Sequence, residues 1–395
     1  MISKRKLIAP IFYLKEDDIM SYPKIDFLYL SEPDMVKAGV NDPVKCTDCM
    51  EDLLKILYEG DYRMGGENGN SHGCMVTFPV EPEFPNMPKD GPDRRFMAMP
   101  AYLGGKFDIA GMKWYGSNVG NRDKKIPRSI LTVMLNDKET GQPKALMSAN
   151  LISAYRTAAI PAVGVRYLAR EDSKVLGIVG PGMINAITAE TFCSIRPIET
   201  IKIKGRGKAS IERFIDYVSE KCPQVKEFIV CDTLEECVRD SDILSFATST
   251  PTGGQANYPT IKDEWVKKGC LICGPGAVNV SDELIAKSKL VVDNSKLYEA
   301  WAEEYPYPTF DTMFLLGCKY LDMVHEGKLD KSRIEDLGGI VSGAIPGRKD
   351  DDEIVLYSIG GMPVEDVAWG KTVYDNAVKL GIGTPLNLWD TPYFY

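Results

Sequence analysis

The chain has 395 residues, of which 44% are hydrophobic and 26% are charged, and its formal net charge at pH 7 is −9. The negative charge argues against nucleic acid as a partner, and the lack of an apolar run of about 18 to 20 residues argues against a membrane span. The length predicts two to three domains with sizeable cores.

Residues 1–25 are predicted to be an N-terminal extension. Pro10 interrupts the apolar run of this segment, and the charged residues 15–18 follow where a signal peptide would have small residues for cleavage. We therefore expect a cytoplasmic protein.

The chain contains 10 cysteines, and several of them lie within apolar runs. This pattern favours buried, reduced thiols over a disulfide framework. The pairs Cys46/Cys49 and Cys270/Cys273 leave a shared zinc site as an alternative, but they lie far apart in the sequence and the second pair encloses an apolar Leu-Ile step. We predict that the chain holds no metal.

The first part of the chain predicts a mixture of strands and helices. Residues 26–30 predict a short strand, and 31–60 predict helical structure with an entry at Asp42-Pro43. The stretch 65–95 is rich in glycine and proline and predicts a long loop of the kind that often carries function. A closely spaced set of strands is then predicted at 96–102, 107–115, 128–135 and 143–147, followed by an alanine-rich helix at 153–169. Such spacing implies an antiparallel or mixed sheet.

From Lys174 the pattern changes to alternating strands and helices. Strands are predicted at 174–180, 198–204, 226–231, 242–247, 269–273, 289–293 and 354–359. Helices are predicted at 183–195, 208–221, 233–240, 281–288, 296–304, 314–325 and 364–380. This alternation predicts a parallel sheet with helices on both faces, and Gly381 is placed to end the last helix.

The segment around Gly180 predicts the strand, glycine turn and helix of a dinucleotide-binding unit. Gly180 permits a tight turn, and Gly182 allows a pyrophosphate to approach the backbone at the start of a helix. Asn185 stands where the motif G-x-G-x-x-G has its third glycine. The prediction therefore depends on the alternating strands and helices that follow.

The end of the second strand in this region predicts which dinucleotide binds. An acidic residue about 20 residues after the glycines would read the ribose 2′-hydroxyl of NAD(H). Lys204, Arg206 and Lys208 cluster there instead, and arginine suits a 2′-phosphate. We therefore expect NADP(H) to be preferred over NAD(H). The alternative is a solvated basic turn without a role in binding.

Short motifs follow one another through the chain: Met99-Pro-Ala-Tyr-Leu103, Gly111-Met-Lys-Trp114, Glu139-Thr-Gly-Gln-Pro143, Tyr155-Arg-Thr-Ala-Ala159, the Gly180 turn, Gly205-Arg206, Gly347-Arg348, Asp352-Glu-Ile354, Ser358-Ile-Gly360, Glu365-Asp366 and Gly381-Ile-Gly-Thr384. In this order they resemble the ornithine cyclodeaminase/mu-crystallin family over roughly residues 26 to 385. The nearest branch is similar to proteins labelled as a component of tyramine oxidase, which share the N-terminal extension and a glycine-rich stretch like that from Arg63 to Gly73.

The resemblance implies an α/β protein of two domains. A Rossmann domain with a doubly wound parallel sheet is expected at 153–344, and an α+β domain for substrate binding and dimerisation at 26–152 together with 345–395. The resemblance also implies a homodimer and a nicotinamide cofactor that acts on amino acids, imines or cyclic imines. Cofactor contacts are expected at Gly180, Pro181, Gly182, Met183, Ile184, Arg206, Lys208, Thr248, Ser249, Gly276, Ser358 and Gly360, with a backbone role for the segment at Ser358.

Two cationic residues are candidates for chemistry. Lys113 lies in an apolar strand next to Trp114, where a lysine is costly unless it is paired or neutral. The matching family lysine faces the substrate, so we expect Lys113 to transfer a proton or hold an anion, with Trp114 as a substrate contact; the alternative is a strand-edge lysine in water. Arg156 resembles a contact to a substrate carboxylate or cofactor phosphate, although an isolated arginine there would be a surface or capping residue.

Two positions depart from the family pattern. The carboxylate-binding arginine expected about seven residues after Gly60 is missing, and Glu67 stands near that place, where it is a candidate for binding a cationic group. Ala277 replaces an aspartate that works on the amino group in cyclodeaminases, and cyclisation needs a group to orient that amine. An amine or a differently held imine is therefore favoured over an α-amino acid.

The glycine-rich loop also contains His72. Histidine can serve as a general acid or base near neutral pH, and His72 is a candidate substrate contact. The alternative is a solvent-exposed loop histidine.

Together these features favour an NADP(H)-dependent oxidoreductase that reduces an imine, or oxidises an amine or amino acid, by hydride transfer. The alternatives are a cyclodeaminase and a cofactor-bound accessory protein without turnover. All three share the fold, so the choice between them depends on the site.

Overall fold

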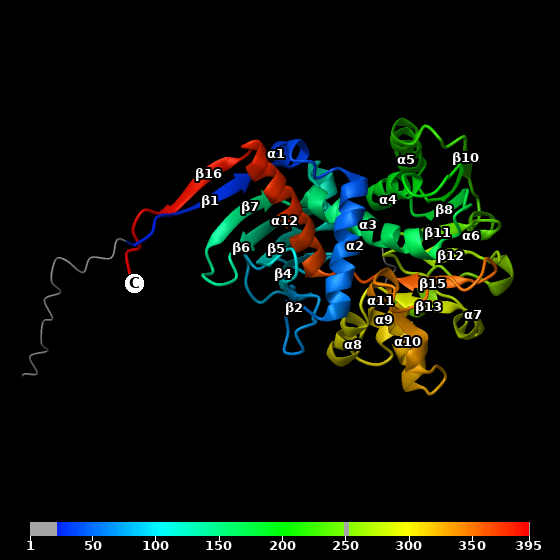
Figure 1. The fold of residues 1–395 in the computed structure, drawn as a ribbon. Coiled ribbons are helices and arrows are strands. Elements are labelled where there is room, and N and C mark those ends of the chain that lie inside the picture. The colour runs from blue at the N-terminus through cyan, green and yellow to red at the C-terminus, as the bar shows by residue number, and fades with distance from the viewer. Residues whose placement is uncertain (1–21, 249–252, 395) are drawn as a thin grey trace, which may run out of the picture.

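The computed structural model describes residues 22–248 and 253–394. Within these residues the strands form two sheets, one in each lobe of the molecule (Figure 1). In the first sheet β1 pairs in parallel with β7, and the other neighbours are antiparallel. This sheet contains β16 (Thr384–Trp389), β1 (Ile25–Leu30), β7 (Pro143–Ser148), β6 (Ser129–Asn136), β5 (Ile109–Ser117), β4 (Arg95–Leu103) and β2 (Tyr62–Met64) in spatial order, with β3 (Cys74–Val76) paired to β4. The predicted mixed sheet is confirmed.

Three long helices accompany the first sheet. α2 (Pro43–Glu59) and α12 (Pro363–Leu380) run side by side, and α3 (Asn150–Leu168) leads into the second lobe (Figure 1). The helical region predicted at 31–60 consists of α1 (Glu32–Lys37) and α2, because Asp42 caps α2 by accepting the N–H of Lys45 at 3.0 Å. α12 ends at Gly381 with φ of 64°, as predicted.

The second sheet is entirely parallel among the described residues. Its strands are, in spatial order, β10 (Glu227–Val230), β9 (Thr200–Lys204), β8 (Val175–Val179), β11 (Ile243–Phe246), β12 (Leu271–Cys273), β15 (Val355–Ser358), β13 (Lys289–Val292) and β14 (Ile334–Asp336). The first six follow the order of a Rossmann fold, in which ligands bind where the order reverses, here between β8 and β11. Its helices are α4 (Met183–Cys193), α5 (Lys208–Lys221), α6 (Leu234–Val238), α7 (Asp282–Lys287), α8 (Ser295–Glu304), α9 (Thr309–Thr312), α10 (Leu316–His325) and α11 (Leu337–Val341).

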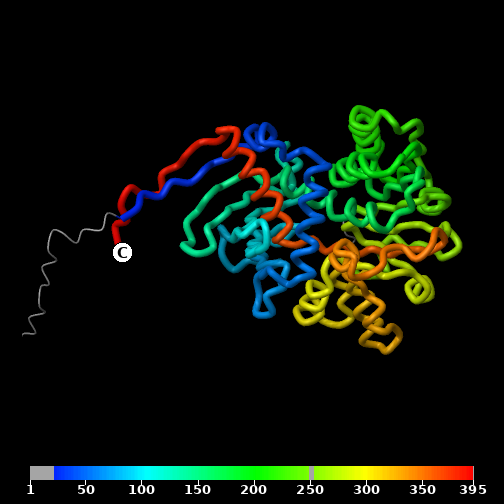
Figure 2. Tube along the Cα trace, in the orientation of Figure 1, coloured from blue at the N-terminus to red at the C-terminus, as the bar shows by residue number. Residues whose placement is uncertain are grey.

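The chain returns to the first lobe later than predicted. β15 pairs with both β12 and β13, so the boundary expected at 345 would divide the second sheet. The chain passes from the second lobe back to the first after Ser358, where β15 ends and the chain continues into α12 (Figure 2). The sequence does not reveal this because the partners of a parallel strand lie far away in the chain.

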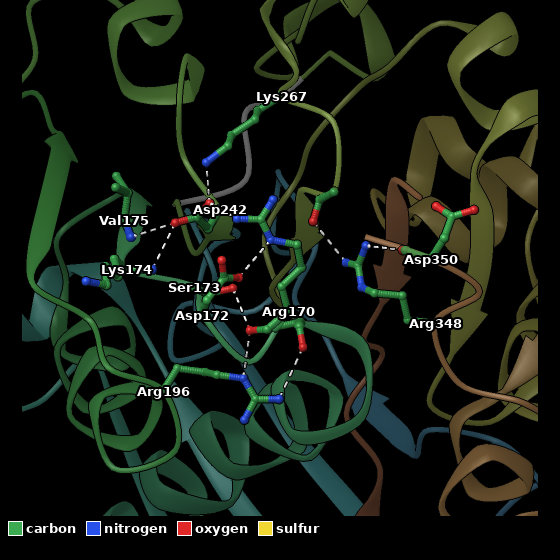
Figure 3. A network of polar contacts seen from close by, with 12 residues as sticks. Arg170, Asp172, Ser173, Lys174, Val175, Arg196, Asp242, Lys267, Arg348 and Asp350 are labelled. Atoms are coloured by element: carbon green, nitrogen blue, oxygen red, sulfur yellow. Dashed lines mark hydrogen bonds and ion pairs between the residues drawn. The ribbon is translucent and has the colours of Figure 1, made fainter. Parts of the chain in front are cut away.

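A group of polar contacts fixes the end of α3 to the second sheet (Figure 3). Asp242 accepts hydrogen bonds from the backbone N–H groups of Lys174 and Val175, both at 2.9 Å. Arg196 and Arg348 donate to carbonyl oxygens of residues 166 to 170. The last carbonyl groups of a helix lack partners within it, so these arginines satisfy them and hold α3 in place.

β1 and β16 form an arm that extends away from the first lobe (Figure 1). β16 was not predicted, because Pro385 lies within this short segment and a proline inside a run argues against a strand. Residues 1–21 of the predicted extension lie outside the described residues. No helix among the described residues is both long and apolar enough to cross a membrane.

Candidate functional site

The glycine turn after β8 lies at the point where the strand order reverses. Gly180 has φ of 91°, and a Cβ there would lie 2.7 Å from the carbonyl oxygen of Ala247. A Cβ on Gly182 would meet nothing within 4 Å, and α4 begins directly after it without a side-chain cap. The turn therefore leaves open space in front of an uncapped helix N-terminus, as a pyrophosphate requires.

Asn185 replaces the third glycine of the motif and fastens the turn. It is fully buried, and its Nδ2 donates to the carbonyl oxygens of Val179 at 3.1 Å and Gly180 at 2.9 Å. Its Oδ1 accepts a hydrogen bond from Ser245 Oγ at 2.8 Å. These bonds tie α4 to the ends of β8 and β11, so the missing glycine does not weaken the turn.

The residues that come after β11 and after β12 in the chain lie opposite the glycine turn. Thr248 Oγ1 is buried and has no hydrogen-bond partner among the described residues, a state that a ligand's polar group would relieve. A Cβ on Gly276 would lie 2.7 Å from the carbonyl oxygen of Phe246, so the loop after β12 packs directly on β11. Ser249 lies outside the described residues. The open space at Gly182 and the orphaned hydroxyl of Thr248 fit a bound dinucleotide.

The basic residues after β9 lie next to the turn. A Cβ on Gly205 would lie 2.7 Å from the ring of Pro181, which places Arg206 beside the glycines. Arg206 and Lys208 are exposed, whereas Lys204 donates to the carbonyl oxygen of Asp232. Two of the three cations are therefore accessible to a ligand.

The segment expected beside the nicotinamide is anchored inside the second lobe. Ser358 Oγ accepts hydrogen bonds from the N–H of Gly317 at 2.8 Å and the hydroxyl of Tyr298 at 3.1 Å. The N–H of Gly360 donates to Asp293 at 2.7 Å, and burial raises the pKa of Asp293 to about 6. Because the Ser358 side chain is engaged, only the backbone of this segment is left for a ligand.

A cavity of about 310 Å³ lies against the first sheet, next to the glycine turn. It brings Lys113, Arg156 and His72 together from three distant parts of the sequence, and Ile184 in the first turn of α4 connects it to the turn. Its lining residues are His72, Arg95, Met99, Lys113, Tyr115, Pro127, Arg128, Ser129, Leu131, Asn150, Ser153, Ala154, Arg156 and Ile184.

Lys113 and Arg156 are paired with two carboxylates from the first turn of α12, and Asp366 contacts both cations. Lys113 Nζ lies 2.7 Å from Asp366 Oδ2, and Arg156 lies 3.2 Å from Asp366 and 2.5 Å from Glu365. The side chains are 3% exposed at Lys113, 8% at Arg156 and 0% at both acids. Unpaired charges would be very costly at this depth, so each cation has a partner.

Burial changes the titration of this cluster. Burial and the charge of Arg156 lower the pKa of Lys113 to about 8, and burial raises the pKa of Glu365 to about 7. Burial opposes the charge of Arg156, but Asp366 and Glu365 outweigh it and raise its pKa. Lys113 can therefore gain and lose a proton near neutral pH, as proton transfer to or from nitrogen requires, while Arg156 stays charged.

His72 reaches the cavity from the glycine-rich loop. Its Nδ1 lies 2.8 Å from the carbonyl oxygen of Gly361, and its ring lies 5.7 Å from that of Trp301. Because a carbonyl oxygen only accepts, Nδ1 carries the hydrogen and Nε2 presents a lone pair. Burial and the charge of Lys113 lower the pKa of His72 to about 4, so it is neutral at pH 7. His72 is thus not a solvated loop residue.

Two arginines at the cavity were not predicted. Arg95 begins β4 and Arg128 precedes β6; Arg95 pairs with Asp93, and Arg128 Nε lies 3.2 Å from the same carboxylate. In β4, Arg95 stands two residues before the buried Met97 and four before the buried Met99. Residues spaced by two share one face of a strand, so this spacing would have placed Arg95 on the inward face. Arg128 ends a loop, where periodicity assigns no face.

Trp114 and Glu67 are not brought to this cavity. Successive side chains of a strand point to opposite faces, so Trp114 points away from the face of Lys113; it is 41% exposed and stacks on Phe96 with centroids 5.9 Å apart. Glu67 is exposed in the turn after β2. The geometry does not support their expected substrate contacts. Ala277 is fully buried and contributes no carboxylate.

The two cysteine pairs lie on different elements. Cys46 and Cys49 are buried on α2, and Cys270 and Cys273 are buried at β12. Over residues 22–248 and 253–394, no three histidine, cysteine or acidic side chains gather in a way that could hold a metal ion.

Comparison with known proteins relates the chain to one family. The model of the ornithine cyclodeaminase/mu-crystallin family matches residues 41–381. The N-((2S)-2-amino-2-carboxyethyl)-L-glutamate dehydrogenase of Staphylococcus aureus is 30% identical over 370 residues, which cover 92% of this chain and 99% of that relative.

Two solved structures share the fold. The Delta(1)-pyrroline-2-carboxylate reductase of Thermococcus litoralis, in complex with NADH and L-proline, has a TM-score of 0.73 and 27% identity, and the match covers 91% of this chain and 99% of that one. An archaeal alanine dehydrogenase dimer with bound NAD has a TM-score of 0.72 and 25% identity, with 92% and 100% covered.

Proposed function

The chain belongs to the ornithine cyclodeaminase/mu-crystallin family, and we propose that it transfers a hydride between a nicotinamide cofactor and the carbon of a C–N bond in a small amino or imino acid. The observation that carries the proposal is the cavity in which Lys113 and Arg156 lie beside the glycine turn. The relatives compared above are named dehydrogenases and a reductase, and the two solved structures hold NADH or NAD. The chain is accordingly a nicotinamide-dependent oxidoreductase.

Gly180, Gly182 and Thr248 would hold the dinucleotide, which supplies the hydride chemistry when bound. In the reductive direction the imine carbon gains a hydride and the nitrogen gains a proton; both leave in the oxidative direction. Lys113, with its lowered pKa, gives or takes that proton. Arg156 binds the substrate carboxylate, and His72 presents Nε2 as an acceptor for a substrate N–H.

A cyclodeaminase reaction is disfavoured by the loop after β12. Ala277 stands at the position of the aspartate that works on the amino group in cyclodeaminases, and it is fully buried. Cyclisation requires a group that orients the attacking amine, and Ala277 cannot act in this way.

The test is turnover of a panel of amino acids, amines and cyclic imines, followed at the nicotinamide absorbance. Replacement of a positioned acid or base costs about 10²- to 10⁴-fold, so we expect Lys113→Met to lower kcat/KM by that factor and to bind NADPH normally. Lys106→Met, at an exposed lysine of the same lobe, is the matched control. Turnover of no compound by a protein that binds NADPH, or full activity in Lys113→Met, would contradict the proposal.

NADP(H) is the preferred cofactor in this proposal. The exposed Arg206 beside the turn and the lack of an acid at the end of β9 support it. We expect NADPH to bind about tenfold more tightly than NADH, and Arg206→Ala to remove most of that difference without changing NADH binding. Fluorescence titration measures both constants, and equal or tighter binding of NADH to the wild type would contradict the preference.

A homodimer is also proposed. One solved relative is an alanine dehydrogenase dimer, and the face of the first sheet opposite the cavity carries exposed apolar residues, among them Phe96, Trp114 and Ile130. Such patches mark interaction sites. Light scattering should give twice the mass of the chain for the wild type, and Trp114→Glu should shift it toward the monomer.

A further inference from the structure

Four cationic side chains reach the cavity in two clusters. The buried cluster consists of Lys113, Arg156, Glu365 and Asp366, and its two cations face two acids. The outer cluster consists of Arg95, Arg128 and Asp93, and its two cations share a single acid. The outer cluster therefore has a positive charge for which the cavity provides no partner.

The outer cluster also has unused hydrogen-bond donors. Arg95 Nε is buried and has no partner among the described residues, although its other nitrogens contact Asp93 and the hydroxyl of Tyr115. Arg128 contacts Asp93 through Nε, which leaves the fork of its terminal nitrogens available. A buried N–H without a partner is costly, and a planar guanidinium binds a carboxylate well.

Tyr115 lies between the two clusters. Lys113 Nζ lies 5.7 Å and Arg95 Cζ lies 5.8 Å from the centroid of its ring, so the two cationic groups are no farther apart than the sum of these distances. Both strands direct these residues to the same face, because Arg95 pairs with Ser117 and Met99 with Lys113. One small molecule can therefore contact both clusters at once.

We propose that the substrate carries a second carboxylate several bonds from the reacting C–N group, bound by Arg95 and Arg128 while Arg156 binds the α-carboxylate. This inference rests on the proposed function and names its substrate class as amino or imino dicarboxylic acids.

The test compares ligands that differ only in the distal group. 2-Oxoglutarate and 2-oxopentanoate have the same five-carbon chain, which ends in a carboxylate or in a methyl group. Calorimetry of each with the NADPH-saturated protein, without ammonia so that no turnover occurs, should show at least about tenfold tighter binding of 2-oxoglutarate. Arg95→Met and Arg128→Met should each reduce the preference to about twofold and leave the Kd of NADPH unchanged.

Arg94→Met is the control, because Arg94 precedes Arg95 and does not line the cavity. Thermal melts check folding, and Arg128, whose side chain is 46% exposed, provides the variant least able to disturb it. Equal binding or no binding of both oxo acids, or a preference that survives in both variants, would overturn the inference. Loss of NADPH binding in both variants would also overturn the inference, because it would indicate that these arginines bind a cofactor phosphate.

Turnover of L-glutamate and L-norvaline with NADP⁺ separates this inference from the proposed function. A carboxylate preference in binding, without turnover of any compound, would support the dicarboxylate site and remove the oxidoreductase assignment. Turnover of L-norvaline at the same kcat/KM as L-glutamate would keep the assignment and overturn the dicarboxylate site.

Discussion

The buried and the outer cluster line the same cavity but balance their charges differently. In the buried cluster every cation has an acid within 3.2 Å, and the side chains are at most 8% exposed. In the outer cluster Arg95 and Arg128 are 31% and 46% exposed and share Asp93. Depth explains the difference, because a buried charge must be paired whereas water stabilises a partly exposed one. The outer cluster therefore carries a net positive charge, whereas the charges of the buried cluster are balanced.

The largest effect is expected from removing the acid that both buried cations share. Asp366→Asn leaves Lys113 and Arg156 with only Glu365, and breaking a buried pair in this way costs about 3 to 5 kcal/mol. We expect urea denaturation to show a loss of this size in the free energy of unfolding.

Glu365→Gln is the matched comparison on the same turn of α12. Burial raises the pKa of Glu365 to about 7, so much of this group is neutral at pH 7 and glutamine resembles that form. The variant should lose less than half as much stability as Asp366→Asn. Between the ordinary pKa of 4.5 and the raised value only the folded wild type holds the extra proton, so its free energy of unfolding should rise relative to the variant as pH falls through this window. Similar losses in the two variants at pH 6 would contradict the assigned charges.

The next effect concerns the pH dependence that Lys113 creates. Its pKa of about 8 in the folded chain lies below its ordinary 10.5, so the unfolded chain binds more protons between these values. The free energy of unfolding of the wild type should therefore rise with pH across this window relative to Lys113→Met.

The titration of Lys113 should give the rates of reduction and oxidation opposite pH dependences. Reduction needs the protonated lysine and should slow as pH rises through 8, whereas oxidation needs the neutral lysine and should accelerate. Measurement of kcat/KM against pH in both directions checks this. If kcat/KM changed in the same direction with pH for reduction and oxidation, the role of Lys113 would be refuted.

The smallest effect is expected in the outer cluster. Asp93→Asn breaks ion pairs to two arginines that water partly screens, so the free energy of unfolding should fall by about 1 kcal/mol, clearly less than in Asp366→Asn. Because the variant frees positive charge, 2-oxoglutarate should bind at least as tightly as to the wild type. A loss of stability as large as that of Asp366→Asn would show that the two clusters do not differ as described.

Periodic sequence patterns predicted most of the fold. The alternation after Lys174 located every strand of the second sheet except β14, and Asp42 and Gly381 marked helix ends through their capping chemistry. The sheet to which β15 belongs was not predictable in this way, although the strand itself was, because its neighbours β12 and β13 are set by tertiary contacts rather than by local pattern.

The site was predicted where single residues carry a distinctive chemistry. Lys113 and Arg156 were identified by a cation in an apolar strand and by family motifs, and the structure brings them together. Trp114 was misplaced because it was judged by its neighbour rather than by strand alternation. Arg128 was missed because its role depends on the loop that carries it to Asp93.

Two segments join the lobes: α3, which leads from β7 to β8, and the stretch from Ile359 to Met362, which leads from β15 to α12. Any rotation of one sheet relative to the other would have to bend the chain at both places. Gly361 lies in the second of these segments, accepts the hydrogen bond of His72, and faces Arg156 closely enough that a Cβ would lie 2.9 Å from its Nη1. Opening of the lobes would thus act directly on the two side chains that we assign to the substrate.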